Sequence, residues 1–295
     1  MPKIPHHFYS YIPLMYHATS IESLTQLLPK LSPPLVLVPT MGALHEGHAT
    51  LVRKARELAG ENGSVILSLF VNPTQFNQSS DLDNYPRTLD ADLNLCKELG
   101  VDTVFSPEPD QVYRQDHSIS VLENSLSKQL CGATRPGHFD GVCTIVLKLF
   151  NLTGADIAVF GKKDYQQLAI IHRLVRDLHL PINIVGVETV RESSGLALSS
   201  RNTNLTSSQR DDAARIRKAL LSAKNAVATG EKSANQLINI AKLAIETSPE
   251  GAKIDYLQLV DAETLAPIEV INPPALLATA VFYGEVRLID NIELF

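Results

Sequence analysis

The alternation of short apolar runs with longer helical segments between residues 35 and 187 is the strongest constraint on the fold. The runs are short enough to be buried strands, and the segments between them carry apolar residues at helical spacing. Parallel strands need a crossover connection, usually a helix, so the alternation predicts an α/β fold with helices on both faces of a parallel sheet. Strands are expected at 35–38, 65–71, 101–105, 157–160 and 182–187, and helices at 20–28, 44–58, 89–99, about 141–151 and 165–178.

The pattern changes after about residue 190, where helical segments are followed by strand segments, an order typical of a small α+β domain. Helices are expected at 207–228 and 233–247, and strands at 254–260, 276–283 and 286–289. The predicted organisation is an N-terminal extension over 1–16, an α/β domain over 17–189, and a smaller α+β domain over 190–295. The smaller domain is expected to close over the ligand site of the α/β domain.

Composition excludes several classes of protein. The 295 residues include 26 Lys and Arg against 32 Asp and Glu, so the formal charge of −6 disfavours binding to a nucleic-acid backbone. No run of about 18 apolar residues is present and the N-terminal segment lacks the apolar core of a secretory signal, so no membrane span or export is expected. Because Cys96, Cys131 and Cys143 lack CxxC spacing, we expect buried free thiols and a reducing cytoplasm.

The first candidate site, PTMGALHEGH from Pro39 to His48, follows the strand expected at 35–38. A glycine turn leads into a helix start that carries His45 and His48 three residues apart. Open α/β sheets bind ligands at the carboxyl ends of their strands, and free N–H groups at a helix start favour a phosphate. Gly47 removes a side chain between the two imidazoles, so a nucleotide can approach the backbone.

Two other interpretations of these histidines have less support. A zinc metalloprotease helix places its histidines at i and i+4, whereas here the spacing is i+3 across a glycine. A solvated surface role suits an isolated histidine better than an HxGH sequence after a strand and a glycine turn. The motif therefore favours a phosphate site.

Two further polar segments follow strands of the same sheet. The sequence FGKKDYQQ offers Lys163 to neutralise phosphate charge and Asp164 to bind a ribose, although Asp164 equally suits a helix N-cap beside solvated lysines. The sequence LSSRN offers Ser199, Ser200 and Arg201 for a polyphosphate, although a serine-rich linker has the same composition.

Two glutamines suit a substrate that carries hydroxyls and a carboxylate, because an amide both donates and accepts hydrogen bonds. Gln75 lies in VNPTQF at the end of the second predicted strand, and Gln167 lies about one turn into the helix expected after Asp164. The nearby acids Asp90 and Asp92 are expected to be solvated.

In combination, six stretches closely resemble the pantothenate synthetase (pantoate–β-alanine ligase) family: PTMGALHEGHATLV, FVNPTQF, YPRTLDADL, GHFDGVCTIVLKLFN, FGKKDYQQL and GLALSSRN. The resemblance runs from about residue 18 to the C-terminus. It implies a cytoplasmic homodimer with a Rossmann-like N-terminal domain. It also implies that (R)-pantoate and β-alanine are joined with ATP and Mg²⁺ through a pantoyl-adenylate, releasing AMP and diphosphate.

The resemblance also implies roles for the residues at matching positions. His48 is the implied proton donor, and we expect His45, His48, Lys163 and Arg201 to stabilise charge on the phosphates. Gln75 would contact pantoate and β-alanine, and Gln167 would contact pantoate. The implied ATP site contains Met41, Gly42, Ala43, Leu44, His45, Glu46, Gly47, His48, Gly161, Lys162, Lys163, Asp164, Val190, Leu198, Ser199, Ser200 and Arg201.

Departures from the family pattern are few. Lys162 stands where Glu is common, Asp140 where Arg is common, and Cys143 where Ala is common. None of these changes removes a motif residue, so activity is expected.

Three alternatives remain open: another HxGH nucleotidyltransferase of a dinucleotide or coenzyme A pathway, a nucleotide-binding regulatory protein without catalysis, and an RNA-binding synthetase fragment. Pyrophosphate exchange that depends on an acyl substrate would separate the ligase from the first alternative. AMP production would exclude the second. The charge of −6 disfavours the third.

Overall fold

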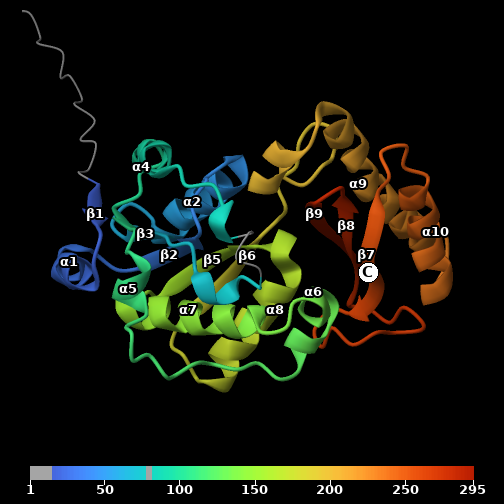
Figure 1. The fold of residues 1–295 in the computed structure, drawn as a ribbon. Coiled ribbons are helices and arrows are strands. Elements are labelled where there is room, and N and C mark those ends of the chain that lie inside the picture. The colour runs from blue at the N-terminus through green and yellow to red at the C-terminus, as the bar shows by residue number, and fades with distance from the viewer. Residues whose placement is uncertain (1–14, 78–81) are drawn as a thin grey trace, which may run out of the picture.

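The computed structural model describes residues 15–77 and 82–295, which form two lobes side by side (Figure 1). One lobe contains a six-stranded parallel sheet and the other a three-stranded antiparallel sheet, so the predicted α/β fold with a smaller α+β domain is confirmed. Most of the expected extension over 1–16 lies outside the described residues. Tyr16, however, already pairs in a strand, so the sheet begins within the segment expected to precede it.

The parallel sheet has the strand order β1-β4-β3-β2-β5-β6. From β2 the chain adds β3 and β4 on one side, then returns to add β5 and β6 on the other. The order therefore reverses between β2 and β5, and open α/β sheets bind ligands at such a switch point. The strands are β1 (Tyr16–Ala18), β2 (Leu35–Thr40), β3 (Ser64–Leu69), β4 (Thr103–Phe105), β5 (Ile157–Gly161) and β6 (Asn183–Val187).

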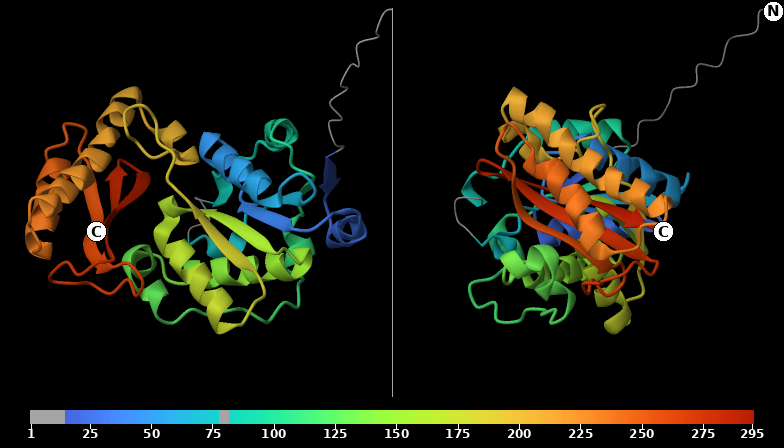
Figure 2. Two further views of the ribbon diagram at one scale, coloured as in Figure 1. Left: turned by 180° about the vertical axis from the view of Figure 1, so that it is seen from behind. Right: turned by 90° about the vertical axis from the view of Figure 1, so that its right-hand side faces the viewer.

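Helices cover both faces of this sheet, as the sequence predicts (Figures 1 and 2). Successive strand side chains point to opposite faces, so Val36 packs with α2 and α4 while Leu37 packs with α1, α7 and α8. These helices are α1 (Ile21–Leu27), α2 (Glu46–Ala59), α4 (Leu89–Glu98), α7 (His138–Thr153) and α8 (Tyr165–Asp177). Shorter helical turns are α5 (Pro109–Val112), α6 (Leu130–Thr134), η1 (Leu28–Lys30), η2 (Pro73–Gln75), η3 (Leu126–Lys128), η4 (Lys162–Asp164) and η5 (Ser200–Asn204).

Two elements differ from the expectation. Strand β1 is not predicted, because three residues are too few to show a periodic pattern. Helix α7 extends beyond the expected 141–151 and is bounded by Gly137 and Gly154, both in the left-handed region with φ of 80° and 59°.

The C-terminal domain places α9 and α10 on one face of the antiparallel sheet β7-β8-β9. The opposite face packs against the first domain, because Val260, Leu276 and Ala278 belong to the same apolar core as α7 and α8. Strand β9 continues beyond residue 289, where the sequence predicts its end. The predicted strand stops there because the polar pair Asp290 and Asn291 interrupts the apolar pattern. The elements are α9 (Ser207–Ala228), α10 (Ala234–Glu246), β7 (Lys253–Asp261), β8 (Ala275–Tyr283) and β9 (Val286–Leu294).

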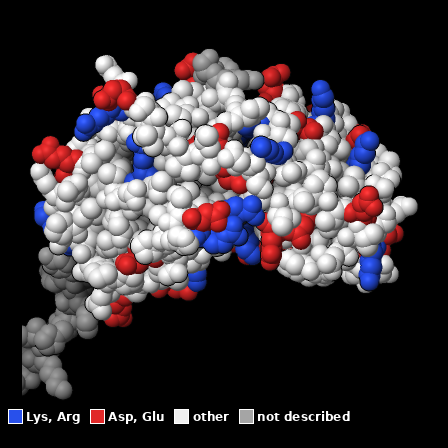
Figure 3. Space-filling model, turned by 90° about the horizontal axis from the view of Figure 1, so that it is seen from below, with Lys and Arg blue, Asp and Glu red and all other residues white. Residues whose placement is uncertain are grey.

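The expectation of buried free thiols is confirmed. Within residues 15–77 and 82–295, the helices are all too short or too polar to cross a membrane. Figure 3 shows acidic and basic side chains intermixed over one face of the molecule. The three cysteines are buried and free, and burial raises the pKa of Cys96 and Cys143 to about 12.

Asp102 joins two strands and a helix, so its removal should destabilise the first domain. Its Oδ2 accepts hydrogen bonds from the Val65 N–H at 2.7 Å and from Arg56 at 3.0 Å. We expect Asp102→Ala to lower the free energy of unfolding by about 1–3 kcal/mol, because the buried Val65 N–H loses its acceptor. Urea unfolding followed by circular dichroism measures this loss.

The matched control for this change is Asp177→Ala, which removes an exposed pair with Arg176 and should leave the free energy of unfolding nearly unchanged. Equal losses in the two variants would contradict the role given to Asp102.

Candidate active site

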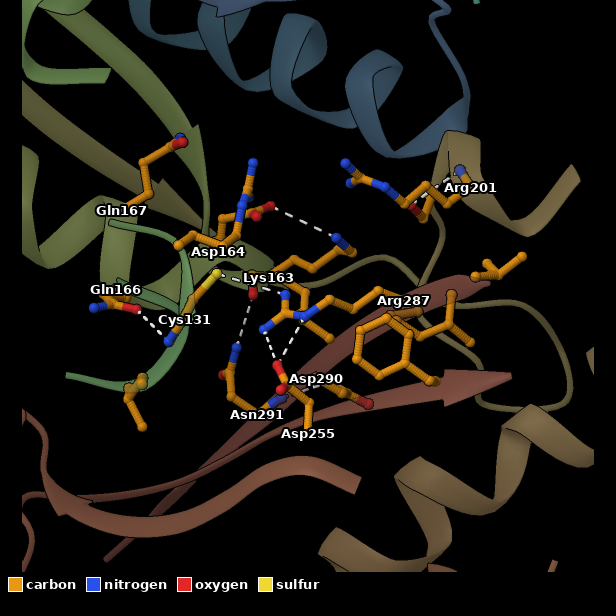
Figure 4. Close-up of a pocket in the computed structure, with 18 of the residues that line it drawn as sticks. Cys131, Lys163, Asp164, Gln166, Gln167, Arg201, Asp255, Arg287, Asp290 and Asn291 are labelled. Atoms are coloured by element: carbon orange, nitrogen blue, oxygen red, sulfur yellow. Dashed lines mark hydrogen bonds and ion pairs between the residues drawn. The ribbon is translucent and has the colours of Figure 1, made fainter. Parts of the chain in front are cut away.

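A cavity of about 760 Å³ lies between the two domains. Several predicted site residues line it: Lys163, Asp164, Gln167, Ser199, Ser200 and Arg201. These residues come from η4, from the first turn of α8 and from the connection between the domains, and Figure 4 shows four of them around the cavity. The residues from Met41 to His48, together with Gln75, Val190 and Leu198, are not among its lining residues.

The switch point brings the HxGH segment beside this cavity. It follows β2, and the segment containing Lys163 follows β5, the strand paired with β2. The charges of Lys163 and Asp164 both act on the imidazole of His48. The structure therefore brings together two segments that lie more than a hundred residues apart in the sequence.

A buried carboxylate shapes the turn between β2 and α2. Asp92 accepts hydrogen bonds from the Ala43 N–H at 2.9 Å and the Leu44 N–H at 2.8 Å. Gly42 has a φ of +83°, and a Cβ there would lie 3.1 Å from Asp92 Oδ2. The expectation that Asp92 is solvated is wrong, since it is 4% exposed, whereas Asp90 is exposed as expected.

The two histidines of the HxGH segment are held by backbone hydrogen bonds. The Gly47 N–H donates to His45 Nδ1 at 3.1 Å, and the His45 N–H donates to His48 Nδ1 at 3.3 Å. Because each Nδ1 accepts a hydrogen bond, each neutral ring carries its hydrogen on Nε2. The two rings contact each other, with centroids 4.2 Å apart, so the pair forms one unit that carries two N–H donors.

Gly47 is required for this arrangement. A Cβ at this position would lie 2.8 Å from His45 Cε1 and 3.9 Å from the Cβ of Leu198. The space above Gly47 is therefore occupied by the His45 ring, which corrects the expectation that it is left open for a nucleotide. Gly161 fits that expectation better, because a Cβ there would meet no atom within 4 Å.

Burial keeps both imidazoles neutral. It lowers the pKa of His48 to about 3, with further lowering by His45 and Lys163. The pKa of His45 is also lowered, first by burial and then by Lys163. At neutral pH the pair offers uncharged hydrogen-bond donors rather than imidazolium ions.

The two neighbouring lysines have different surroundings. Lys163 lines the cavity, with its Nζ 3.6 Å from Asp164 Oδ2. Asp164 occupies the N-cap position of α8 but makes no capping hydrogen bond, so the simple capping interpretation is wrong. Lys162 pairs with Glu188 at 2.5 Å and Glu293 at 3.5 Å and lines a separate cavity of about 180 Å³. The structure therefore does not support its side chain as part of the ATP site.

The segment after β6 forms a hairpin, and Ser199, Ser200 and Arg201 follow it directly. The Leu198 N–H donates to the Val190 carbonyl at 3.0 Å, which closes the base of the hairpin. Ser199 Oγ accepts a hydrogen bond from the Arg201 N–H at 3.3 Å. Val190 and Leu198 thus support this segment structurally.

The glutamines occupy different places. Gln75 is buried, and its amide donates to Met41 Sδ at 2.9 Å and accepts from Asn72 at 3.1 Å. Gln167 lines the cavity. Its neighbour Gln166 is buried and bonded to main-chain groups of η3, of Gln129 and of the first turn of α6, so it has a structural role.

Arg135 and His138 line the cavity, yet the sequence analysis assigns them no role. His138 donates from Nδ1 to the Gln75 carbonyl at 2.7 Å, which leaves Nε2 to accept from Arg135 at 3.3 Å. His138 lies within GHFDGVCTIVLKLFN, so the family resemblance includes its stretch without indicating its position. The sequence also misses Asp255 and Arg287, which form a 2.7 Å ion pair at the cavity wall.

Known proteins share this sequence closely. The profile of the pantoate-β-alanine ligase family matches residues 16–293. The chain is 56% identical over 260 residues to a pantothenate synthetase of Akkermansia muciniphila, covering 88% of this chain and 92% of that protein. It is 49% identical over 257 residues to a pantothenate synthetase of Ruminiclostridium cellulolyticum, covering 87% and 90%.

Solved structures share the fold. The pantothenate synthetase of Thermus thermophilus superposes with a TM-score of 0.89 at 41% identity, over 95% of this chain and all of that one. The pantoate-β-alanine ligase of Francisella tularensis, solved with "Beta-gamma ATP" and β-alanine, gives a TM-score of 0.78 at 35% identity, over 95% and 98%.

The buried His138 should make folding stability depend on pH. Its folded pKa is lowered to about 4, chiefly by burial, from an ordinary value of 6.5, so the unfolded chain takes up a proton first as pH falls. The associated stability is present above pH 6.5 and is lost as pH falls toward 4. Between pH 7.5 and 5.0 we expect His138 to account for a loss of about 2 kcal/mol.

Urea unfolding of the wild type and of His138→Gln at both pH values measures this contribution. The glutamine can still donate to the Gln75 carbonyl but does not titrate. The variant should therefore lose less stability on acidification, and an identical loss in both proteins would contradict the assignment.

Proposed function

This chain belongs to the pantoate–β-alanine ligase family, and we propose that it joins (R)-pantoate to β-alanine through a pantoyl-adenylate, releasing AMP and diphosphate. The observation that carries the mechanism is the grouping of the two neutral imidazoles with Lys163 at the β2–β5 switch point. Such a grouping suits a nucleotide whose phosphates lie at the ends of these strands.

In the first step a pantoate carboxylate oxygen attacks the α-phosphorus of ATP, and the bond to the bridging oxygen of the leaving diphosphate breaks. A carboxylate needs no general base, so catalysis consists of positioning and stabilisation of charge on the phosphoryl oxygens. His45 and His48 donate hydrogen bonds from Nε2, and Lys163 and Arg201 supply positive charge. His48 is thus a neutral hydrogen-bond donor to the α-phosphate or leaving group.

In the second step the β-alanine amine attacks the acyl carbon of the mixed anhydride. The new carbon–nitrogen bond replaces the bond to the AMP oxygen, AMP leaves with the electron pair, and the amine loses a proton. AMP is a good leaving group, so little acid or base assistance is needed. Closure of the C-terminal domain over the cavity would protect the anhydride from water.

The remaining assignments follow the chemistry of the side chains. Gln75 and Gln167 bind pantoate through their amides, and Gln75 also contacts β-alanine. Asp164 has a carboxylate free of capping bonds, which suits a ribose hydroxyl. ATP is bound by residues 41–48, by Gly161, Lys163 and Asp164, and by the segment from the hairpin to Arg201.

Magnesium fits this site as a partner of the nucleotide. Among the described residues, no group of three or more His, Cys, Asp and Glu side chains is arranged to hold a metal ion. Mg²⁺ commonly takes most of its ligands from substrate phosphates and water, so a protein cage is not needed. When bound, the ion would neutralise phosphate charge.

Three further parts belong to the proposal. The homodimer rests on the family alone, the cytoplasmic location rests on the family and on the free thiols, and the division into a catalytic domain over 17–189 and a closing domain over 190–295 rests on the change of pattern near residue 190. No membrane or nucleic-acid partner is proposed.

Exchange of labelled pyrophosphate into ATP tests the adenylate directly. The wild type should exchange label with pantoate and Mg²⁺ in the absence of β-alanine, and the full reaction should yield AMP. We expect His48→Ala and Lys163→Ala to lower the exchange rate by about 10²-fold or more, because each removes a stabilising group worth roughly 3 kcal/mol. Arg201→Ala should also slow the exchange.

Lys242→Ala is the control, since it removes an exposed lysine on α10 and should exchange at the wild-type rate. Production of ADP and phosphate would instead show an acyl-phosphate ligase. Exchange without pantoate, or with a different acceptor only, would favour another HxGH nucleotidyltransferase.

Substitution of the glutamines tests the pantoate site. We expect Gln75→Ala and Gln167→Ala to raise the KM for pantoate by about 5- to 100-fold, because each leaves a substrate oxygen without its partner. The KM for ATP should change by less than about threefold. Steady-state kinetics measures both, with the exposed Gln236→Ala as control. A raised KM for ATP with unchanged pantoate dependence would show that the pocket is assigned incorrectly.

A further inference from the structure

Asn291, in the part of β9 that extends beyond its expected end, binds the main chain at Lys163. Its Nδ2 donates to the carbonyl oxygens of Lys162 and Lys163, both at 3.0 Å. Figure 4 shows the amide directed from the C-terminal sheet toward this segment. An amide nitrogen carries two hydrogens, so both are used on these two carbonyls.

The position of Asn291 is itself fixed by its neighbour. Asp290 is 4% exposed, and its Oδ1 accepts the Asn291 N–H at 2.8 Å. The same carboxylate makes two hydrogen bonds with Arg191, at 2.7 and 2.8 Å. Paired, charge-assisted bonds of this kind restrict the geometry strongly. Arg191 also donates to the Gly195 carbonyl at 3.1 Å, so the carboxylate joins β9 to the hairpin.

The hairpin continues this connection to the segment that contains Arg201. Glu192, next to Arg191, accepts a hydrogen bond from the buried Asn202 at 3.0 Å. Asn202 also donates to the Ala197 carbonyl at 3.0 Å. The middle of β9 therefore contacts both segments assigned to the phosphates, one directly and one through Arg191.

We propose that Asn291 is a positioning residue that sets the place of the Lys163 ammonium relative to the HxGH imidazoles. It acts through the main chain of Lys163. The C-terminal domain thus takes part in the chemistry of the first domain. This inference rests on the role given to Lys163 in the proposed function.

Loss of the Asn291 amide should slow the first half-reaction. A displacement of about 1 Å in a group that stabilises the transition state can cost on the order of 10²-fold in rate. We expect Asn291→Ala to lower the maximal rate of pantoate-dependent pyrophosphate exchange by about 10- to 100-fold. The KM for pantoate should change by less than about threefold, because Gln75 and Gln167 are not bonded to Asn291.

A double-mutant cycle with Lys163→Ala separates positioning from general damage. If Asn291 acts through Lys163, the double variant should exchange within about twofold of Lys163→Ala alone. In the Arg201→Ala background, by contrast, Asn291→Ala should lower the exchange rate by the same 10- to 100-fold as in the wild type. If Asn291 had a purely structural role, Asn291→Ala would lower the exchange rate by the same factor in the Lys163→Ala and Arg201→Ala backgrounds.

The matched control is Glu293→Gln, on the same face of β9 two residues away. It weakens the contact with Lys162 but leaves both Asn291 hydrogen bonds, so it should exchange within about threefold of the wild type. If Asn291→Ala does not fold, Asn291→Asp keeps the shape of the side chain and replaces the donor by an acceptor. The cycle is then measured with that variant and has the same expected result.

The outcomes distinguish a failure of the Lys163 site assignment from a failure of the Asn291 positioning role. Wild-type exchange by Lys163→Ala would overturn the site assignment in the proposed function, and the positioning role with it. Slow exchange by Lys163→Ala, combined with wild-type exchange by the folded Asn291 variant, would overturn the positioning role alone. Losses that multiply in the Lys163→Ala background would also overturn it.

Discussion

The reversal of strand order between β2 and β5 is the constraint on which the rest of the site depends. At this point the connections from two neighbouring parallel strands leave toward opposite sides of the sheet and open a crevice. The HxGH segment and the segment of Lys163 begin at these two strand ends, so their proximity follows from topology. A different strand order would separate them, however well each motif were preserved.

Electrostatics at the crevice combine fixed positive charge with neutral donors. Burial lowers the pKa of His45 and His48, so repulsion from Lys163 is avoided while each ring keeps an N–H group that can donate a hydrogen bond. Backbone N–H groups hold both Nδ1 atoms and thereby direct the Nε2 hydrogens. Donors fixed before a substrate binds need little reorganisation as charge develops, which is the physical reason for the catalytic role proposed for them.

The two domains are connected by more than a linker. An apolar core continues from α7 and α8 into β7 and β8, and beside it Asp290 and Asn291 contact the segments on either side of the cavity. The apolar contact holds the domains together without directional preference, whereas the hydrogen bonds determine orientation. The positions of the groups that line the cavity therefore depend on both the apolar contact and the hydrogen bonds between the domains.

The sequence by itself determined the fold class and most of the order of strands and helices, and it indicated the segments to which the chemistry is assigned. Apolar periodicity and glycine turns are local properties, so a reader can recognise them without a structure. Tertiary structure alone decided that Asp92 is buried under the 42–44 turn, that Lys162 pairs with Glu188, and that Asn291 donates hydrogen bonds to the main chain at Lys163. These contacts join residues dozens or more positions apart, and no local pattern specifies which polar side chain will meet which backbone group once the sheet and the domains have packed.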